Sequence, residues 1–126
     1  MKFSSENCSK LLHIQPAIGG STSTEWAGIA IDGRGNSWVC GNTNAATYFT
    51  ATNHGGGDAL VIKLSPSGTQ LSVDLVGGLK GEEFYAVTVD SNNNAYFVGY
   101  SISPSVDDQT RAGDYYCSLY SYYFDF

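Results

Sequence analysis

Hydrophobic and polar residues alternate in short runs along most of this chain, and polar turns separate the runs. The runs at residues 27–32, 37–42, 58–64 and 69–76 are rich in β-branched and apolar residues, and Gly, Asn, Asp, Ser or Pro bound them. Alternation with a period of two between such turns is typical of β-strands. No segment keeps an apolar period of 3.6 residues, so the pattern predicts an all-β protein.

The run at residues 58–64, Asp-Ala-Leu-Val-Ile-Lys-Leu, is apolar on both of its alternating faces. A sheet that is apolar on both faces needs a neighbour on each face, as stacked blades of a β-propeller provide. We expect Ala59 and Val61 on one face, and Leu60, Ile62 and Leu64 on the other.

An internal repeat appears when the chain is shifted by 58 residues against itself. Residues 18–43 then lie over residues 76–101 without a gap. Each copy has two strand-like runs around a polar turn, which predicts a β-hairpin. The identical pairs are Gly19 with Gly77, Gly20 with Gly78, Glu25 with Glu83, Asp32 with Asp90, Asn36 with Asn94, and Gly41 with Gly99.

The polar turns of the two hairpins are Asp32–Asn36 and Asp90–Asn94. Gly and Asn tolerate the left-handed backbone that tight turns require, and the leading Asp can accept hydrogen bonds from turn amides. In the second copy Asn92 and Asn93 replace a glycine-containing pair, which preserves the turn because Asn also tolerates positive φ.

Two other motifs partly match these turns. Asp90–Ala95 is similar to the start of a calcium loop, but Ala95 stands where the loop has Gly, and Ser101 stands where it has Glu. Asp32–Trp38 is similar to the Asp-box of sialidase-type propellers, with one residue too many. We therefore expect hairpin turns, with no metal and no glycosidase site.

Residues 55–68, Gly-Gly-Gly-Asp-Ala-Leu-Val-Ile-Lys-Leu-Ser-Pro-Ser-Gly, the following Leu-Val-Gly-Gly and the two hairpins resemble the bacterial β-propeller repeat family SBBP over residues 18–121. The resemblance implies propeller blades, mostly in secreted or cell-surface proteins, and no reaction common to the family. It implies structural roles for Gly19, Gly20, Asp32, Asn36, Gly41, Asp58, Gly77, Gly78, Asp90, Asn94, Gly99 and Asp114.

The chain holds enough strands for about two four-stranded antiparallel blades, whereas a propeller has ~4–8. We expect an N-terminal tail at 1–10 and a repeat segment at 11–126, with a complete unit at about 18–78 and a partial one at about 76–126. Two interpretations stay open. The chain is a fragment of a longer propeller protein, or it is a two-blade protomer whose N-terminal strand completes the C-terminal blade of another copy in a ring.

The segment Asp114-Tyr-Tyr-Cys117 is similar to the tetrapeptide before the third hypervariable loop of antibody domains. No Trp follows Cys40 at the spacing of that fold, and no Phe-Gly-x-Gly follows the segment. Residues 57–65 lie over residues 113–121 at an offset of 56, which places Tyr116 at Leu60, Cys117 at Val61 and Leu119 at Lys63. We therefore expect a third blade strand that opens with Asp-Tyr-Tyr-Cys.

Composition and charge narrow the partners. The net charge is −6, and the six Lys and Arg residues form no cluster, which argues against nucleic acid and anionic membranes. No apolar run approaches the ~20 residues of a membrane span. The first residues lack the hydrophobic stretch of a signal peptide, so either export takes another route or the true N-terminus is missing. The localisation is therefore unknown.

The three cysteines, Cys8, Cys40 and Cys117, form neither a zinc spacing nor an even disulfide set. We interpret Cys40 and Cys117 as buried apolar residues, with a bridge between them as the alternative. His13 and His54 lie far apart, and we expect the Gly-rich segment around His54 to be a connector. No acid–base pair stands out, so we expect no catalytic residues and no cofactor.

Aromatic residues offer the candidate binding chemistry. Trp26, Phe84, Trp38 and Tyr96 are expected to pack between blades. We expect Tyr48 and Phe49 in the long loop, and Tyr100 at a strand end, to be exposed and available to a ligand.

The sequence thus predicts a non-catalytic β-propeller segment that acts as a binding or interaction scaffold, with a protein or carbohydrate partner. Two alternatives remain. One is a two-blade lectin-like protomer that binds carbohydrate after assembling into a ring, and the other is part of a larger propeller enzyme with its active site elsewhere.

Overall fold

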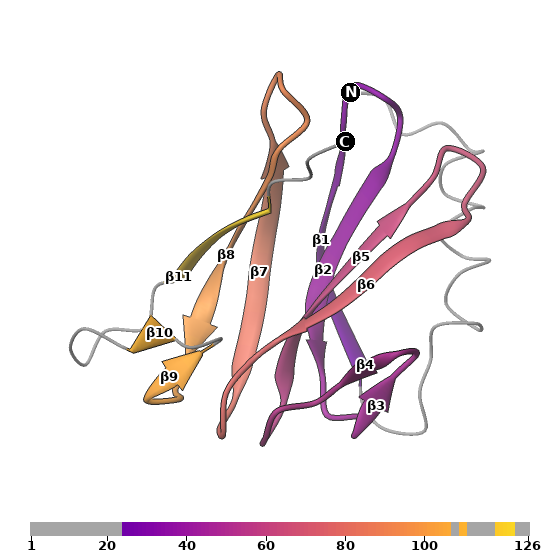
Figure 1. Ribbon diagram of the computed structural model, residues 1–126. Helices are drawn as coiled ribbons and strands as arrows, with labels where there is room; N and C mark the ends of the chain where they lie inside the picture. Colours follow the sequence, from indigo (N-terminus) through magenta and orange to yellow (C-terminus); the bar gives the residue numbers. More distant parts are fainter. Residues whose placement is uncertain (1–23, 107–108, 111–117, 123–126) are drawn as a thin grey trace.

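A computed structural model describes residues 24–106, 109–110 and 118–122, and every regular element in these residues is a β-strand (Figure 1). No helix in the described residues is long and apolar enough to cross a membrane. The strands are β1 (Thr24–Ile31), β2 (Ser37–Thr43), β3 (Thr47–Tyr48), β4 (Ala51–Thr52), β5 (Asp58–Leu64), β6 (Gln70–Val76), β7 (Glu82–Val89), β8 (Ala95–Ser101), β9 (Ser105–Val106), β10 (Gln109–Thr110) and β11 (Ser118–Tyr122).

Two antiparallel sheets form the body of the molecule. The first has the strand order β1-β2-β5-β6, and the second has the order β11-β8-β7. Two small hairpins, β3–β4 and β9–β10, extend from the loops (Figure 1). The strand predicted at residues 58–64 is confirmed without a change, and the other predicted strands of the first sheet differ by one to three residues at their ends.

The turns adopt the backbone that their residues favour. Gly35 and Asn93 occupy the same place in the two repeats, and both have positive φ, 83° and 67°. Gly68 has a φ of 85° in the turn between β5 and β6, where its amide donates to the carbonyl oxygen of Ser65. The prediction that Asn93 can replace a turn glycine is confirmed.

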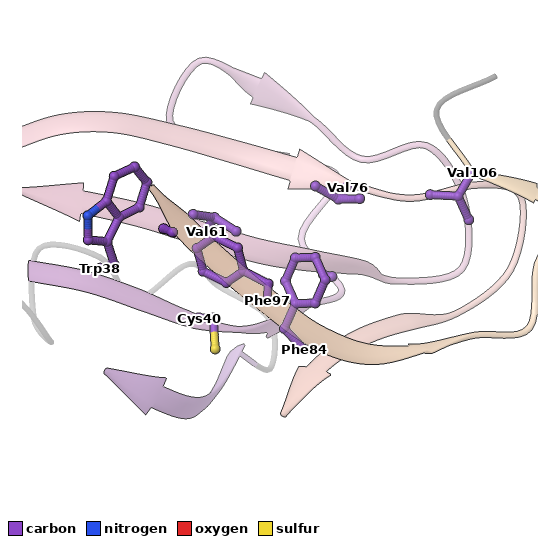
Figure 2. Close-up of a cluster of buried hydrophobic side chains, with 9 residues drawn as sticks. Trp38, Cys40, Val61, Val76, Phe84, Phe97 and Val106 are labelled. Carbon is purple, nitrogen blue, oxygen red and sulfur yellow. The ribbon is translucent and has the colours of Figure 1, made fainter. Parts of the chain in front are cut away.

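An apolar core, here called the inter-sheet core, lies between the two sheets (Figure 2). The ring of Trp38 packs edge-on to Phe97 with centroids 6.2 Å apart, and Phe84 packs on Phe97 at 5.3 Å. The large side chains of this core are fully or almost fully buried, and burial of each aromatic ring stabilises the fold by about 1.5–3 kcal/mol. This core makes the two sheets neighbouring layers.

A second core, here called the far core, covers the opposite face of the first sheet. Leu60, Ile62 and Leu64 of β5 lie there, and Tyr48 of the β3–β4 hairpin packs among them. Ala59 and Val61 lie in the inter-sheet core, so the prediction that β5 is apolar on both faces is confirmed.

The two blades stack in the same orientation, so the face of the first sheet that contacts the second sheet corresponds to the outward face of the second sheet. Phe84 of the second sheet packs against the first sheet, whereas its equivalent Trp26 lies at the margin of the far core. Trp38 is in the inter-sheet core, whereas its equivalent Tyr96 lies on the outward face of the second sheet. The prediction of packing between blades is confirmed for Phe84 and Trp38, but Trp26 and Tyr96 face away from the contact between these two sheets.

The third strand of the second sheet has a different register from the predicted one. Ser118 of β11 pairs with Gly99, as Leu60 of β5 pairs with Gly41. The offset is therefore 58 residues, not 56, and Leu119 takes the place of Val61. The segment Asp-Tyr-Tyr-Cys lies outside the described residues.

Candidate functional site: the open face of the second sheet

The repeated Asp and Asn residues build the hairpin turns. The carboxylate of Asp32 accepts hydrogen bonds from the backbone amides of Arg34 and Asn36, from Asn36 Nδ2 and, at 3.3 Å, from Trp38 Nε1. Burial raises the pKa of Asp32, but these hydrogen bonds outweigh it, so that the pKa lies below its ordinary value. Both oxygens of the carboxylate thus accept hydrogen bonds that stabilise the hairpin turn.

Asp90 repeats this arrangement in the second hairpin. It accepts hydrogen bonds from the amides of Asn92 and Asn94, from Asn94 Nδ2 and from the hydroxyl of Tyr96 at 2.9 Å. The side chain of Asn94 is the main cause of the lowered pKa of Asp90. The tyrosine hydroxyl therefore replaces the indole nitrogen of the first repeat, which sequence comparison could not reveal.

The repeated glycines allow strands to approach closely. A Cβ on Gly41 would overlap the carbonyl oxygen of Glu25, and one on Gly99 would overlap that of Glu83. Gly77 lies against the carboxylate of Asp58, and Gly78 against Ser103 and Ser105. These glycines serve backbone packing. Gly19, Gly20 and Asp114 lie outside the described residues.

Asp58 and His54 form a pair that the sequence did not predict. The Oδ2 atom of Asp58, whose side chain is fully buried, lies 2.6 Å from Nδ1 of His54 and accepts a hydrogen bond from the His54 amide. His54 therefore anchors its Gly-rich segment, which sequence reasoning took for a plain connector. His13 lies outside the described residues.

The predicted binding aromatics separate into buried and exposed residues. Tyr48 is 2% exposed, so the prediction that its side chain is exposed is wrong. Burial also raises the pKa of its phenol to about 12. Phe49, the next residue, is 52% exposed at the tip of the β3–β4 hairpin and has a φ of 54°. The two rings pack edge-on with centroids 5.4 Å apart, so Phe49 covers Tyr48 and is itself half-exposed.

We call the outward face of the second sheet the open face. Val98 is 38% exposed there, and Ala86 and Thr88 are also exposed. In the first sheet the equivalent of Val98 is Cys40, which is completely buried in the inter-sheet core. The open face therefore corresponds to the face of the first sheet that the second sheet covers.

A pair of tyrosines lies at one end of the open face. The rings of Tyr85 and Tyr100 are stacked, with centroids 5.7 Å apart and an angle of 27° between their planes. Tyr85 is the extra residue of a β-bulge between Phe84 and Ala86, and it is 54% exposed. Tyr100 was predicted from the sequence and is half-buried, whereas Tyr85 was missed because a bulge interrupts the alternation of faces.

Within the described part of the chain, no three His, Cys, Asp or Glu side chains gather in a geometry that can hold a metal ion. Cys40 is a buried free thiol, as predicted, and burial raises its pKa to about 11. Cys117 lies outside the described residues. The candidate site on the open face consists of the stacked rings of Tyr85 and Tyr100, the aliphatic side chain of Val98, and the carboxylate of Glu83, which is paired with Tyr100 in the β7–β8 ladder.

Two stacked antiparallel sheets with repeated turns define the class of the chain as β-propeller blades. Residues 17–49 match the family model SBBP, described as a beta-propeller repeat, and the match covers β1, β2 and β3. Residues 17–49 are therefore similar to one repeat of this family, in agreement with the resemblance. No match to a curated protein sequence was found.

Proposed function

We propose that this chain is a non-catalytic β-propeller segment that acts as an interaction scaffold, and that its open face docks a further blade of the same repeat type. The observation that supports the proposal is the equivalence of Val98 with Cys40. The second blade buries Cys40 of the first blade, whereas Val98 of the second blade is exposed.

The contact between the two blades serves as the template for docking. Gly28 and Cys40 of the first blade lie against Ala86 and Val87 of the second, and a Cβ on Gly28 would sit 3.3 Å from Ala86 Cα. The docked blade would present an aromatic residue at the place of Phe84 and a β-branched residue at that of Val87. Burial of apolar surface of this kind stabilises the docked state by about 25 cal/mol per Å².

The shared polar residues favour a scaffold over an enzyme. Asp32, Asn36, Asp90 and Asn94 are all engaged in hydrogen bonds that shape their turns. A catalytic role would have to use residues that the repeat does not share. We therefore assign the repeated residues to the fold and the binding function to its surface.

A ring-forming lectin is the second candidate, favoured by the exposed rings of Phe49 and Tyr85, since aromatic faces stack on sugars. Ring closure between copies would bring the open face of one copy to the far core of another. Leu60 and Ile62 of that core are already buried within their own chain, while Trp26 and Val39 are half-buried. In a ring, the open face of one copy would therefore contact Trp26 and Val39 at the margin of the far core of the next copy.

Size-exclusion chromatography with light scattering on the full chain tests the proposal. We expect association that increases with protein concentration because the open face gains a covering blade. A discrete trimer would favour the ring, and binding on a glycan array that requires that trimer would favour the lectin. A chain that stays monomeric at every concentration would contradict docking through the open face.

A further inference from the structure

The stacked tyrosines lie at the end of the open face, beside the area on which a blade would dock. In the first blade, the residues equivalent to Tyr85 and Tyr100 are Ala27 and Asn42. Ala27 is exposed and Asn42 is half-buried even though the second blade covers the adjacent Gly28 and Cys40. A blade docked on the open face would accordingly leave Tyr85 accessible.

A carboxylate lies beside this pair. Glu83 is directly opposite Tyr100 in the β7–β8 ladder, and directly opposite residues of two paired strands project from the same face. Within the described residues Glu83 has no ion pair. Burial raises the pKa of Tyr85, and the negative charge of Glu83 raises it further. The ladder pairing of Glu83 with Tyr100 therefore places a carboxylate beside the aromatic surface.

This combination suits a cation better than a neutral ligand. Aromatic faces attract cations through the ring quadrupole, and the guanidinium of Arg can stack on a ring while its N–H groups meet a carboxylate. The net charge of −6 also steers a cationic partner toward the protein. A sugar would use the ring face and would gain nothing from the charge.

We propose that Tyr85, Tyr100 and Glu83 bind an arginine side chain of a basic peptide segment in a partner protein. The guanidinium stacks on the exposed face of Tyr85, and Tyr100 supports that ring from the other side. Glu83 accepts hydrogen bonds from the guanidinium. The site belongs to the second blade alone, because the first blade has Ala27 and Asn42 at the two aromatic positions.

Titration of the full chain with the peptide acetyl-Gly-Arg-Gly-Arg-Gly-amide, followed by isothermal calorimetry or NMR, tests the proposal. We expect saturable binding that weakens when salt is raised from roughly 50 to 500 mM, because salt screens exposed charges. The peptide with citrulline in place of arginine should bind about tenfold more weakly, since it lacks the charge for a cation–π contact.

The chain supplies its own matched variants. Tyr85→Ala and Tyr100→Asn install the residues of the first blade, and Glu83→Gln removes the charge; each should weaken binding of the arginine peptide. Tyr85→Phe should retain it, because the ring face remains. Glu25→Gln changes the equivalent carboxylate of the first blade and should leave binding unchanged. Far-UV circular dichroism and the melting temperature show that each variant is folded.

Three results would overturn the proposal. They are absence of binding to the arginine peptide, equal binding of the citrulline peptide, and full binding by folded Tyr85→Ala. A neutral oligosaccharide that binds through Tyr85 but is insensitive to Glu83→Gln would reassign the surface to carbohydrate. Val98→Gln, which alters the docking area without adding charge, should leave arginine binding unchanged, so that this inference and the proposed docking function fail separately.

Discussion

The backbone amide of Gly33 donates a hydrogen bond of 2.7 Å to Oδ1 of Asn93, which ties the hairpin turn of the first blade to that of the second. Asn93 occupies the place of Gly35 and has the same left-handed backbone. The replacement of glycine by Asn therefore keeps the turn and adds a contact between blades.

The contribution of this contact can be measured with two variants of Asn93. Asn93→Gly keeps the left-handed backbone but loses the hydrogen bond, so we expect a loss of about 0.5–1.5 kcal/mol in the free energy of unfolding. Asn93→Ala should lose about 1 kcal/mol more, because a Cβ without a local polar partner disfavours positive φ. Urea unfolding measures both, and equal stability of Asn93→Gly and wild type would show that the contact contributes nothing.

The turn carboxylates predict that stability falls in acid. The pKa values of Asp32 and Asp90 lie below the ordinary value of 3.8 in the folded chain, so their stabilisation is present above 3.8 and is lost as the pH falls through the folded values. Urea unfolding between pH 7 and pH 2 should therefore show a smaller acid loss in Asp32→Asn and Asp90→Asn than in wild type.

Asp74 provides a control of opposite sign. Burial raises its pKa, so its charged form is disfavoured in the fold and its cost is greatest above the folded pKa. Asp74→Asn should raise the free energy of unfolding at pH 7. An unchanged acid loss in the two turn variants, or a destabilised Asp74→Asn at pH 7, would contradict this account of the carboxylates.

Alanine at the repeated strand glycines should destabilise both blades. In Gly41→Ala and Gly99→Ala the new methyl group meets a backbone carbonyl of the neighbouring strand, and overpacking of this kind costs about 1–3 kcal/mol. Gly81→Ala is the matched control, because its Cβ would be 3.7 Å from Ile102, an ordinary contact. Thermal unfolding should rank Gly81→Ala with wild type, and an equal loss in all three variants would refute the packing explanation.

The thiol of Cys40 should react slowly with alkylating reagents in the folded protein. Burial raises the pKa of its thiol to about 11, which leaves little of the reactive thiolate at pH 8. We expect iodoacetamide to modify Cys40 slowly in buffer and rapidly in urea. Peptide mass spectrometry separates Cys40 from Cys8 and Cys117. An equal rate under both conditions would show that the inter-sheet core opens readily.

The sequence predicted the fold where strong local signals agree. Residues 58–64 are apolar on both faces and are bounded by glycines and a Pro-Ser-Gly turn, so the limits of β5 follow from the pattern. The hairpin β3–β4 was missed because its strands have two residues each, too few to show a period. The boundaries of the repeat units at 18–78 and 76–126 stay predictions.

The candidate site was harder to predict because it depends on geometry rather than composition. The bulge at Tyr85 breaks the alternation that assigns residues to faces, so its ring joins Tyr100 without any periodic signal. Tyr48 was expected at the surface because it lies in the long loop after the second strand, but tertiary packing buries it in the far core with Leu60. The register of the third strand was predicted two residues away from the observed one. The sequence alignment followed the matching Gly-Asp pairs at 57–58 and 113–114, whereas the observed register follows the pairing with β8.

Sedimentation equilibrium of the full chain and of Val98→Glu tests most directly whether the open face docks another blade. Leu71→Glu is the control, because Leu71 is also exposed but lies on β6 of the first blade. We predict that wild type and Leu71→Glu associate with increasing concentration and that Val98→Glu stays monomeric, because a buried charge opposes docking. Association of Val98→Glu to the same extent as wild type would contradict the account.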